Sequence, residues 1–398
     1  MDGPANWTRP DDIRAQLERL WSSGRLLTAG LNGESLFPFT VMFKKPGTAD
    51  LARRFNEVRD WIRELENGSR SRIGFGYEIE WLARNHRELG RQNVPARVVV
   101  PTEADALHLL GKSAQAQSFR RLMEMSLGAF PGMESWFARR PFIALEHADD
   151  WNRILDVVTW FCSHRGSGLY LRQVEIAGTD TKFIEERKGL FSELLDAVGT
   201  SEAVEAREDN FEQRFGLRPK PPLVRFRFLD QQLYIAGLSD LAIPGADFAR
   251  LAPAVNTVFI TENDINGLAF PDVPASLVIF GLGYGLERLS QATWLADKTL
   301  YYWGDTDTHG FAMLNRLRAV FPGVKSFLMD RETLLAHRTS WVREDEPYAG
   351  ALERLTSDEL SVFDDLRHDR FGPRVRLEQE RISFGWIRLA LDGLHLSS

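Results

Sequence analysis

Two apolar, β-rich runs in the C-terminal half of the chain each stop at a carboxylate. Residues 258–261 are followed by Glu262, and residues 300–303 are followed closely by Asp305 and Asp307. If both runs are parallel strands of one sheet, their carboxyl ends lie on the same edge, which is where open α/β sheets bind ligands. Carboxylate oxygens are the ligands that hard cations such as Mg²⁺ or Mn²⁺ prefer. The pattern therefore predicts a divalent-metal site built from Glu262, Asp305 and Asp307.

The segment Asp305-Thr306-Asp307 has a second interpretation, an exposed turn whose last aspartate caps a helix. Gly304 and Gly310 would allow the backbone to leave its pleat, so that both carboxylates could face one cation. A helix starting near His309 would bring its first N–H groups close to phosphate oxygens. The presence of Glu262 upstream favours the metal site over the simple turn.

Other acidic residues follow or flank apolar segments, and each has two interpretations. Asp330 comes directly after residues 327–329, and we favour a helix cap for it over a metal ligand. Residues 374–381 mix basic and acidic side chains. Either Glu378 or Glu380 completes the metal site beside phosphate-binding arginines, or the segment is an exposed, salt-bridged surface.

The composition is typical of a globular protein. Of the 398 residues, 43% are hydrophobic and 26% are charged, and the length fits two or three domains. No apolar run is long enough for a transmembrane helix, and the N-terminus lacks the features of a secretory signal, so we expect no membrane partner. Cys162 is the only cysteine, which favours a cytoplasmic location. The net charge of −7 does not exclude a local nucleic-acid-binding patch.

The first two hundred residues are predicted to be mainly helical. Apolar residues at helical spacing predict helices within 11–27, 49–65, 75–90, 102–110, 117–165 and 182–198. Short strands are predicted at 40–43 and 168–174. The order of helix, helix, strand and helix is compatible with a winged-helix module. The composition then shifts at 199–222, where Gly and Pro accumulate, and this predicts a domain boundary.

The C-terminal half alternates between strands and helices. Strands are predicted at 223–230, 255–261, 276–280, 300–304 and 324–329, and helices at 286–296, 309–321 and 331–338. Elements of this length in this order predict an α/β domain, with a mostly parallel, doubly wound sheet flanked by helices.

Two other chemistries fit part of the pattern. A haloacid-dehalogenase-type phosphatase uses Asp-x-Asp-x-Thr after an apolar strand, but here His309 is at the fifth position and Thr308 falls one place early. An enzyme with such an aspartate nucleophile also gives Glu262 no role.

A transesterase would use a tyrosine of the winged-helix module as its nucleophile. Tyr170 lacks the expected motif and is predicted to lie inside an apolar strand, so we interpret it as structural.

Several segments of the chain, which include the acidic strand ends, resemble JetD, the nuclease subunit of Wadjet. Wadjet is an SMC-based bacterial plasmid-defence system. The resembling segments of the C-terminal half are 261–263, 302–310, 327–330 and 376–380. Those of the N-terminal half are 37–39, 58–61, 89–92, 172–174 and 181–185. The likeness spans nearly the whole chain, and the combination is much more specific than the Asp-x-Asp motif alone.

The resemblance implies a layout like that of the topoisomerase VI A subunit. An N-terminal arm domain would occupy residues 1–100, a winged-helix module 101–200, and a Toprim-like catalytic domain 215–398. It implies loss of the attacking tyrosine, with hydrolysis in its place. It also implies a homodimer that cuts both strands of circular plasmid DNA delivered by an SMC–kleisin partner complex.

We therefore expect a metal-dependent DNA endonuclease. Asp305 and Asp307 would hold Mg²⁺ or Mn²⁺ against a phosphate oxygen, and Glu262 would bind metal or act as a general base or acid. Glu378 or Glu380 would complete the metal site. The modest basic content around these residues indicates that DNA binding depends on a partner complex. A catalytically silent DNA-binding or scaffold subunit is the alternative.

Overall fold

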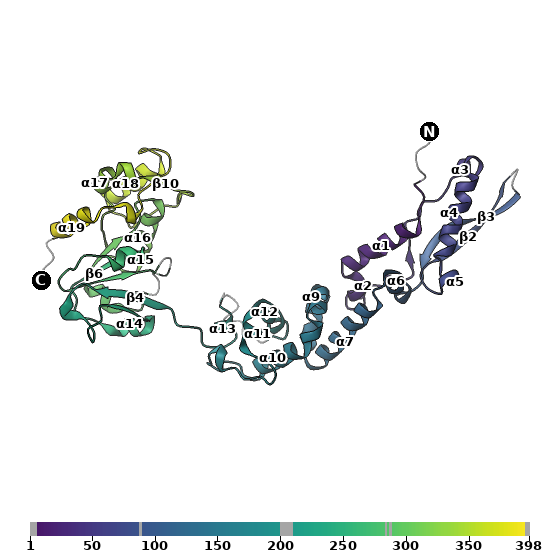
Figure 1. Cartoon of the computed structure of the whole chain (residues 1–398), viewed down its shortest axis with the longest axis horizontal. Coiled ribbons are helices and arrows are strands. Elements are labelled where there is room, and N and C mark those ends of the chain that lie inside the picture. The colour runs from purple at the N-terminus through teal and green to yellow at the C-terminus, as the bar shows by residue number, and fades with distance from the viewer. Residues whose placement is uncertain (1–5, 87–89, 200–209, 283–284, 286–288, 395–398) are drawn as a thin grey trace. The chain divides into compact units, whose positions relative to one another are not determined.

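The protein divides into two compact units, residues 1–219 and 220–398, and Figure 1 labels many of their helices and strands. This computed structural model describes residues 6–86, 90–199, 210–282, 285 and 289–394. The boundary falls within the segment 199–222, where the composition shifts. The further division of the first unit near residue 100 stays a prediction.

The first unit is mainly helical and carries one small antiparallel sheet in the order β1-β3-β2, as far as the described residues extend. Its helices and strands are α1 (Pro10–Ser22), α2 (Arg25–Thr28), β1 (Phe39–Thr40), α3 (Thr48–Arg53), α4 (Phe55–Asn67), α5 (Arg70–Ile73), β2 (Glu78–His86), β3 (Gly90–Val100), α6 (Glu103–Leu110), α7 (Ser113–Ala129), α8 (Glu134–Arg139), α9 (Pro141–Glu146), α10 (Trp151–Ser163), α11 (Thr181–Glu186), α12 (Lys188–Ala197) and α13 (Phe211–Arg214).

Two clusters of buried hydrophobic side chains hold the first unit together. One extends along the chain from Ile13 to Ala116, and the other from Phe119 to Leu217. Trp61 lies in the first cluster, and its indole N–H donates to the carbonyl of Thr8 at 2.8 Å. The predicted helices at 11–27, 49–65, 102–110, 117–165 and 182–198 are confirmed, because helices form most of each range.

The helix predicted over much of 75–90 is wrong, because this segment belongs to a β-hairpin. Strand β2 pairs antiparallel with β3, and the register shifts between Glu80 and Trp81. Trp81 and its neighbour Leu82 are both exposed. The strand therefore lacks the strict alternation of apolar and polar residues from which a half-buried strand is predicted. Residues 87–89, which include the start of the segment 89–92, lie outside the described residues.

The strand predicted at 168–174 is also wrong. Leu171–Gln173 form a 3₁₀ turn, and among the described residues between Val100 and Leu223 there is no strand, only an isolated bridge. Tyr170 is therefore not inside a strand. Its ring is exposed, and the Arg218 guanidinium lies 5.3 Å from the ring centroid. The winged-helix module stays a prediction, without the strand that was expected in it.

The second unit is an α/β domain. Its helices and strands are β4 (Leu223–Phe228), β5 (Asp240–Pro244), α14 (Gly245–Leu251), β6 (Thr257–Thr261), α15 (Asp264–Leu268), β7 (Ser276–Phe280), β8 (Thr299–Trp303), α16 (Thr308–Val320), β9 (Lys325–Ser326), α17 (Arg331–Ala336), β10 (Val342–Arg343), α18 (Ser357–Arg367), β11 (Val375–Arg376) and α19 (Phe384–Gly393). No helix among the described residues of either unit has the length and apolar character needed to traverse a bilayer.

The main sheet of the second unit is mostly parallel, as predicted. Among the described residues its strand order is β5-β4-β7-β6-β8-β9. Strands β7, β6, β8 and β9 run parallel to one another, whereas β4 is antiparallel to both of its neighbours. Every residue of β6 and β7 is buried, which explains their continuous apolar sequences. Phe259 and Tyr301 stack on one face, with 5.4 Å between their ring centroids.

Two predictions for the second unit are only partly right. The strand predicted at 324–329 is limited to Lys325–Ser326, because Leu328 has a φ of 58° and the chain there is not extended. In place of a helix at 286–296, the described residues contain a 3₁₀ helix at Thr293–Asp297, and residues 286–288 lie outside the described part.

Candidate functional site

The sheet register brings the two predicted acidic strand ends side by side. Strand β6 is parallel to β8, and Thr261 at the end of β6 is the partner of Trp303 at the end of β8. Glu262 and Gly304 are therefore the first residues beyond two adjacent strands at the same edge. The prediction that the carboxyl ends of these strands share one edge is confirmed.

The loop after β8 turns sharply and starts a helix. The Asp307 carboxylate accepts the backbone N–H of Gly310 at 2.7 Å, which caps the N-terminus of α16. A Cβ atom on Gly310 would lie 2.0 Å from the Asp305 carbonyl oxygen, so glycine is required for this close approach. Thr306 is tied to Leu377 by two backbone hydrogen bonds of 2.9 and 3.1 Å. The aspartate pair is thus held by its own helix and by the C-terminal segment.

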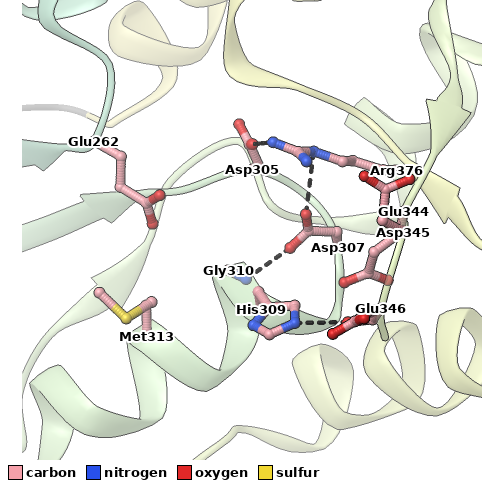
Figure 2. A pocket seen from close by; sticks show the side chains of 10 residues that line it. All are labelled: Glu262, Asp305, Asp307, His309, Gly310, Met313, Glu344, Asp345, Glu346 and Arg376. Atoms are coloured by element: carbon pink, nitrogen blue, oxygen red, sulfur yellow. Dashed lines mark hydrogen bonds and ion pairs between the residues drawn. The ribbon is translucent and has the colours of Figure 1, made fainter. Parts of the chain in front are cut away.

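A cavity of about 490 Å³ opens at this edge. In Figure 2, Glu262 enters the cavity from the side opposite Glu344 and Asp345, and Asp305 and Asp307 lie between them. The lining residues are Glu262, Asp305, Asp307, His309, Gly310, Met313, Glu344, Asp345, Glu346 and Arg376.

Arg376 lies between the two aspartates. Its Nη2 donates a hydrogen bond of 2.5 Å to Oδ2 of Asp305. Its Nε lies 3.2 Å from Oδ2 of Asp307, as an ion pair without the alignment of a hydrogen bond. Burial lowers the pKa of Arg376, but the hydrogen bond and the charge of Asp305, together with the nearby Asp307 and Glu378, raise it overall.

Negative charge is in excess in the cavity. Among the described residues that line it, six are carboxylates and one is an arginine. Burial raises the pKa of Asp307 to about 7, and the charges of Glu344 and Asp305 add to the rise, although the Gly310 N–H and Arg376 act against it. Because the donors are carboxylate oxygens and their charge is not balanced, the residues present fit a hard divalent cation.

Glu262 differs from the other two predicted ligands in its partner, which is Tyr302 rather than Arg376. Burial raises its pKa, and the charge of Asp305 contributes, whereas a hydrogen bond from the Tyr302 hydroxyl acts in the opposite direction. Tyr302 is the penultimate residue of the neighbouring strand β8, and its hydrogen bond helps to hold the Glu262 carboxylate in place.

Gln379 links the C-terminal segment to both strand ends, and it was not predicted. It is almost completely buried. Its side-chain amide donates to the carbonyl of Trp303 at 2.5 Å and accepts from the Thr261 hydroxyl at 2.7 Å. Its backbone N–H donates to Oδ1 of Asp305 at 2.9 Å. Gln379 therefore holds the ends of β6 and β8 at a fixed distance, although it lies more than seventy residues further along the chain.

The other acids named from the sequence lie outside the cavity lining. Glu378 pairs with Arg381 at 2.7 Å, and Glu380 accepts from the side chain of Asn263 at 3.1 Å. Asp330 accepts the backbone N–H of Thr333 at 2.8 Å and caps α17. The helix-cap interpretation of Asp330 is confirmed. Glu378 is salt-bridged but only partly exposed, and the roles of Glu378 and Glu380 as metal ligands stay predictions.

Three acidic residues that the sequence analysis did not select also line the cavity: Glu344, Asp345 and Glu346. They follow β10, which pairs antiparallel with β11 and so lies beside Arg376. Glu344 is buried and accepts from the Thr308 hydroxyl at 2.6 Å. The sequence signal that could have identified these residues is a run of three consecutive acidic residues after a short strand.

No ready-made metal-ligand set exists among the described residues, because no three acidic, His or Cys side chains are already gathered as one. Asp305 and Asp307 converge on Arg376 rather than on open space. That Glu262, Asp305 and Asp307 together bind one metal ion therefore stays a prediction. The structure brings the three residues to one cavity and puts a guanidinium between two of them.

The fold and the site define an α/β protein with an acidic cavity at the carboxyl edge of a mostly parallel sheet. The family described as "Wadjet protein JetD, C-terminal" matches residues 216–391. The family described as "Uncharacterized protein conserved in bacteria N-term" matches residues 10–196. The chain belongs to the JetD family of Wadjet proteins. No curated protein matches it.

Proposed function

We propose that the chain is the metal-dependent DNA endonuclease subunit of a Wadjet anti-plasmid defence complex. The observation that carries this proposal is the acidic cavity at the sheet edge, where Glu262, Asp305 and Asp307 line one space of about 490 Å³. Membership of the JetD family supports the defence context.

Asp305 and Asp307 are the residues that would hold Mg²⁺ or Mn²⁺. Each uses one carboxylate oxygen to accept a backbone N–H, from Gln379 and Gly310 respectively. Their orientation is therefore set before any ion binds. A divalent cation bound there would stabilise negative charge on the phosphate oxygens during hydrolysis.

Glu262 would either contribute a ligand or move the proton of the attacking water or of the leaving oxygen. Its burial and the hydrogen bond from Tyr302 hold it at one margin of the cavity. A raised pKa brings a carboxylic acid closer to the range in which general acids and bases act at neutral pH.

The charge of the cavity bears on how DNA would reach it. Six carboxylates repel phosphates, so the cavity would accept DNA only after a cation has entered. The chain also has a net charge of −7. Both facts support delivery of DNA by a partner complex rather than unaided binding, and we propose that an SMC–kleisin complex brings circular double-stranded DNA to the site. A homodimer would supply one site for each DNA strand.

Cleavage of circular DNA by the complete complex tests this proposal, with Asp305→Asn/Asp307→Asn as the decisive variant. Asparagine keeps the hydrogen-bond acceptor that caps α16, so the fold should survive. We expect cleavage to require Mg²⁺ or Mn²⁺ and to fall by about a thousandfold or more in the variant, equivalent to roughly 4 kcal/mol.

Asp330→Asn is the matched control, because Asp330 also caps a helix beyond the sheet but lies outside the cavity. It should cleave at the native rate. Full cleavage by the double variant in the same complex would overturn the assignment of the site.

A catalytically silent DNA-binding or scaffold subunit is the second candidate. The observation that favours it is the Arg376 side chain, which already pairs with both aspartates. DNA binding by the complete complex without any cut product, at every divalent-metal concentration tried, would favour this function.

An aspartate-nucleophile phosphatase has less support. The threonine of its motif would have to face the substrate, whereas Thr308 is fully buried and donates its hydroxyl hydrogen bond to Glu344.

A further inference from the structure

Arg376 uses the carboxylate oxygens that a cation would need. Oδ1 of Asp305 accepts the backbone N–H of Gln379, and Oδ1 of Asp307 accepts the backbone N–H of Gly310. The remaining oxygen of each carboxylate, Oδ2, faces the Arg376 guanidinium at 2.5 and 3.2 Å. A cation that bridges the two aspartates through their Oδ2 atoms would therefore bind where the guanidinium now lies.

The backbone of Arg376 is fixed, so only its side chain can leave. Arg376 pairs with Val342 in the β10–β11 ladder, and its neighbour Leu377 exchanges two backbone hydrogen bonds with Thr306. The Arg376 side chain is 35% exposed, whereas that of Asp307 is 5% exposed. The Arg376 side chain is thus more exposed to solvent than the Asp307 carboxylate, although its Nε atom is buried.

A divalent cation is attracted to these carboxylate oxygens more strongly than the guanidinium is. At the same distance, a doubly charged ion attracts each carboxylate twice as strongly as a singly charged guanidinium does. The contact between Nε of Arg376 and Asp307 is also poorly aligned for a hydrogen bond. Entry of a cation would therefore release a guanidinium with several unused N–H donors.

Among the described residues, the only carboxylate within ion-pair distance of the Arg376 guanidinium besides the two aspartates is already paired. Glu378 is 3.8 Å from its Nη2, but Glu378 already pairs with Arg381 at 2.7 Å. Phosphate is the chemical group that best matches the fork of donors of an arginine, because its oxygens accept two parallel hydrogen bonds. A backbone phosphate drawn to a cation on Asp305 and Asp307 would lie within reach of such a side chain.

We propose that Arg376 occupies the cation position between Asp305 and Asp307 in the metal-free protein, and that metal entry moves its guanidinium onto a phosphate of the bound DNA. This inference rests on the proposed function, because it assumes that the cavity takes a divalent cation. It makes Arg376 both a competitor of the metal and a ligand of the substrate, which couples metal binding to DNA binding.

Mn²⁺ titration of the full chain without DNA, followed by electron paramagnetic resonance, tests the first half. Arg376→Gln removes the competing charge, so its Mn²⁺ affinity should rise about tenfold, as for the loss of one hydrogen bond between charged groups. Arg381→Gln removes an arginine from the same segment that touches neither aspartate, and its Mn²⁺ affinity should stay within twofold of the native value. Arg376→Lys should lie between the native protein and Arg376→Gln.

Affinity for a short DNA duplex at saturating Mn²⁺ tests the second half. Arg376→Gln should bind the duplex about tenfold more weakly, although it binds Mn²⁺ more tightly. Opposite changes in the two affinities separate this role from general damage to the fold, which weakens both.

Native protein that binds Mn²⁺, together with an Arg376→Gln variant of equal or lower Mn²⁺ affinity, would overturn the inference and leave the proposed function standing. Absence of Mn²⁺ binding in both proteins would overturn the proposed function itself, and this inference with it.

Discussion

Two arginines of the second unit face carboxylates, and their surroundings differ in charge balance. Arg318 and Glu359 form a buried pair, each 8% exposed. Every group of the Arg318 guanidinium has a partner: Nη1 and Nη2 bind Glu359, Nη1 also binds the Arg354 carbonyl, and Nε binds the Val324 carbonyl. Burial raises the pKa of Glu359, but hydrogen bonds from Arg318 and others outweigh it and hold the pKa below its ordinary value.

Arg376 is in the opposite situation, because one guanidinium faces six carboxylates across the cavity. There the pKa of Asp307 rises to about 7. A balanced buried pair has nothing further to bind and serves the fold. A cluster in which carboxylates outnumber the arginine leaves negative charge that a cationic ligand can balance. Charge balance therefore separates the structural arginine from the one that we propose to be functional.

The largest effect is expected from Glu262→Gln, measured as cleavage by the complete complex. If Glu262 moves a proton, the rate should fall by about 10²- to 10⁴-fold, whereas the melting temperature should change little. Mn²⁺ affinity decides its role: an unchanged affinity assigns it to proton transfer, and a large loss assigns it to metal binding. A cleavage rate within threefold of native would exclude both roles.

Breaking the balanced pair should cost stability and leave the cavity intact. Glu359→Gln removes the charge that Arg318 needs, and loss of one partner of a buried ion pair costs about 3–5 kcal/mol. Urea unfolding gives the free energy, and Mn²⁺ titration below the unfolding midpoint should match the native protein. A variant of native stability would show that this pair is not the structural counterpart of the cavity.

Asp307→Asn should stabilise the metal-free protein, and only at high pH. The folded protein holds the Asp307 proton up to a pKa of about 7, whereas the ordinary value is 3.8. The folded state is therefore favoured below about pH 4, and this advantage is lost as the pH rises through 7. The difference corresponds to at most about 4 kcal/mol.

Urea unfolding in EDTA at pH 4 and at pH 8 measures this effect. The asparagine variant should exceed the native protein at pH 8 and equal it at pH 4. A variant that is less stable than native at pH 8 would contradict the idea that buried charge is unbalanced at Asp307.

The smallest effect is expected from Asp330→Ala, which removes the cap of α17. Loss of an N-cap costs about 1 kcal/mol, visible as a small fall in melting temperature. Mn²⁺ affinity should not change, because Asp330 does not line the cavity. A marked loss of Mn²⁺ affinity would restore Asp330 as a metal ligand and extend the unbalanced cluster to the next strand.

The sequence predicts best where a single strong pattern determines the element. Residues 276–280 form a strand with the predicted limits because a continuous apolar run buried on both faces has few alternatives. That Glu262 and Asp305 lie at the same edge followed from the parallel sheet alone, whereas the pairing of β6 with β8 that makes them neighbours did not. The hairpin of β2 and β3 was missed because its exposed apolar residues, such as Trp81, break the alternation that marks a strand.

Four of the ten residues that line the cavity, Glu344, Asp345, Glu346 and Arg376, could not be placed there because their position depends on long-range pairing. Arg376 and Glu344 meet Asp307 only because β10 pairs with β11 and because Leu377 bonds to Thr306. No local pattern reveals such contacts. The one local signal was the run of three acidic residues at 344–346. Bringing them near other carboxylates costs free energy unless a cation binds there.

The hydrogen bonds of Gln379 make the end of the chain indispensable to residues far upstream of it. A shortened polypeptide that stopped before residue 376 would still contain Glu262, Asp305 and Asp307. It would lack the amide that spaces the two strands and the guanidinium that neutralises the aspartates. A truncation that removes residues 376–379 would therefore disrupt the cavity even though it leaves all three acidic residues in place.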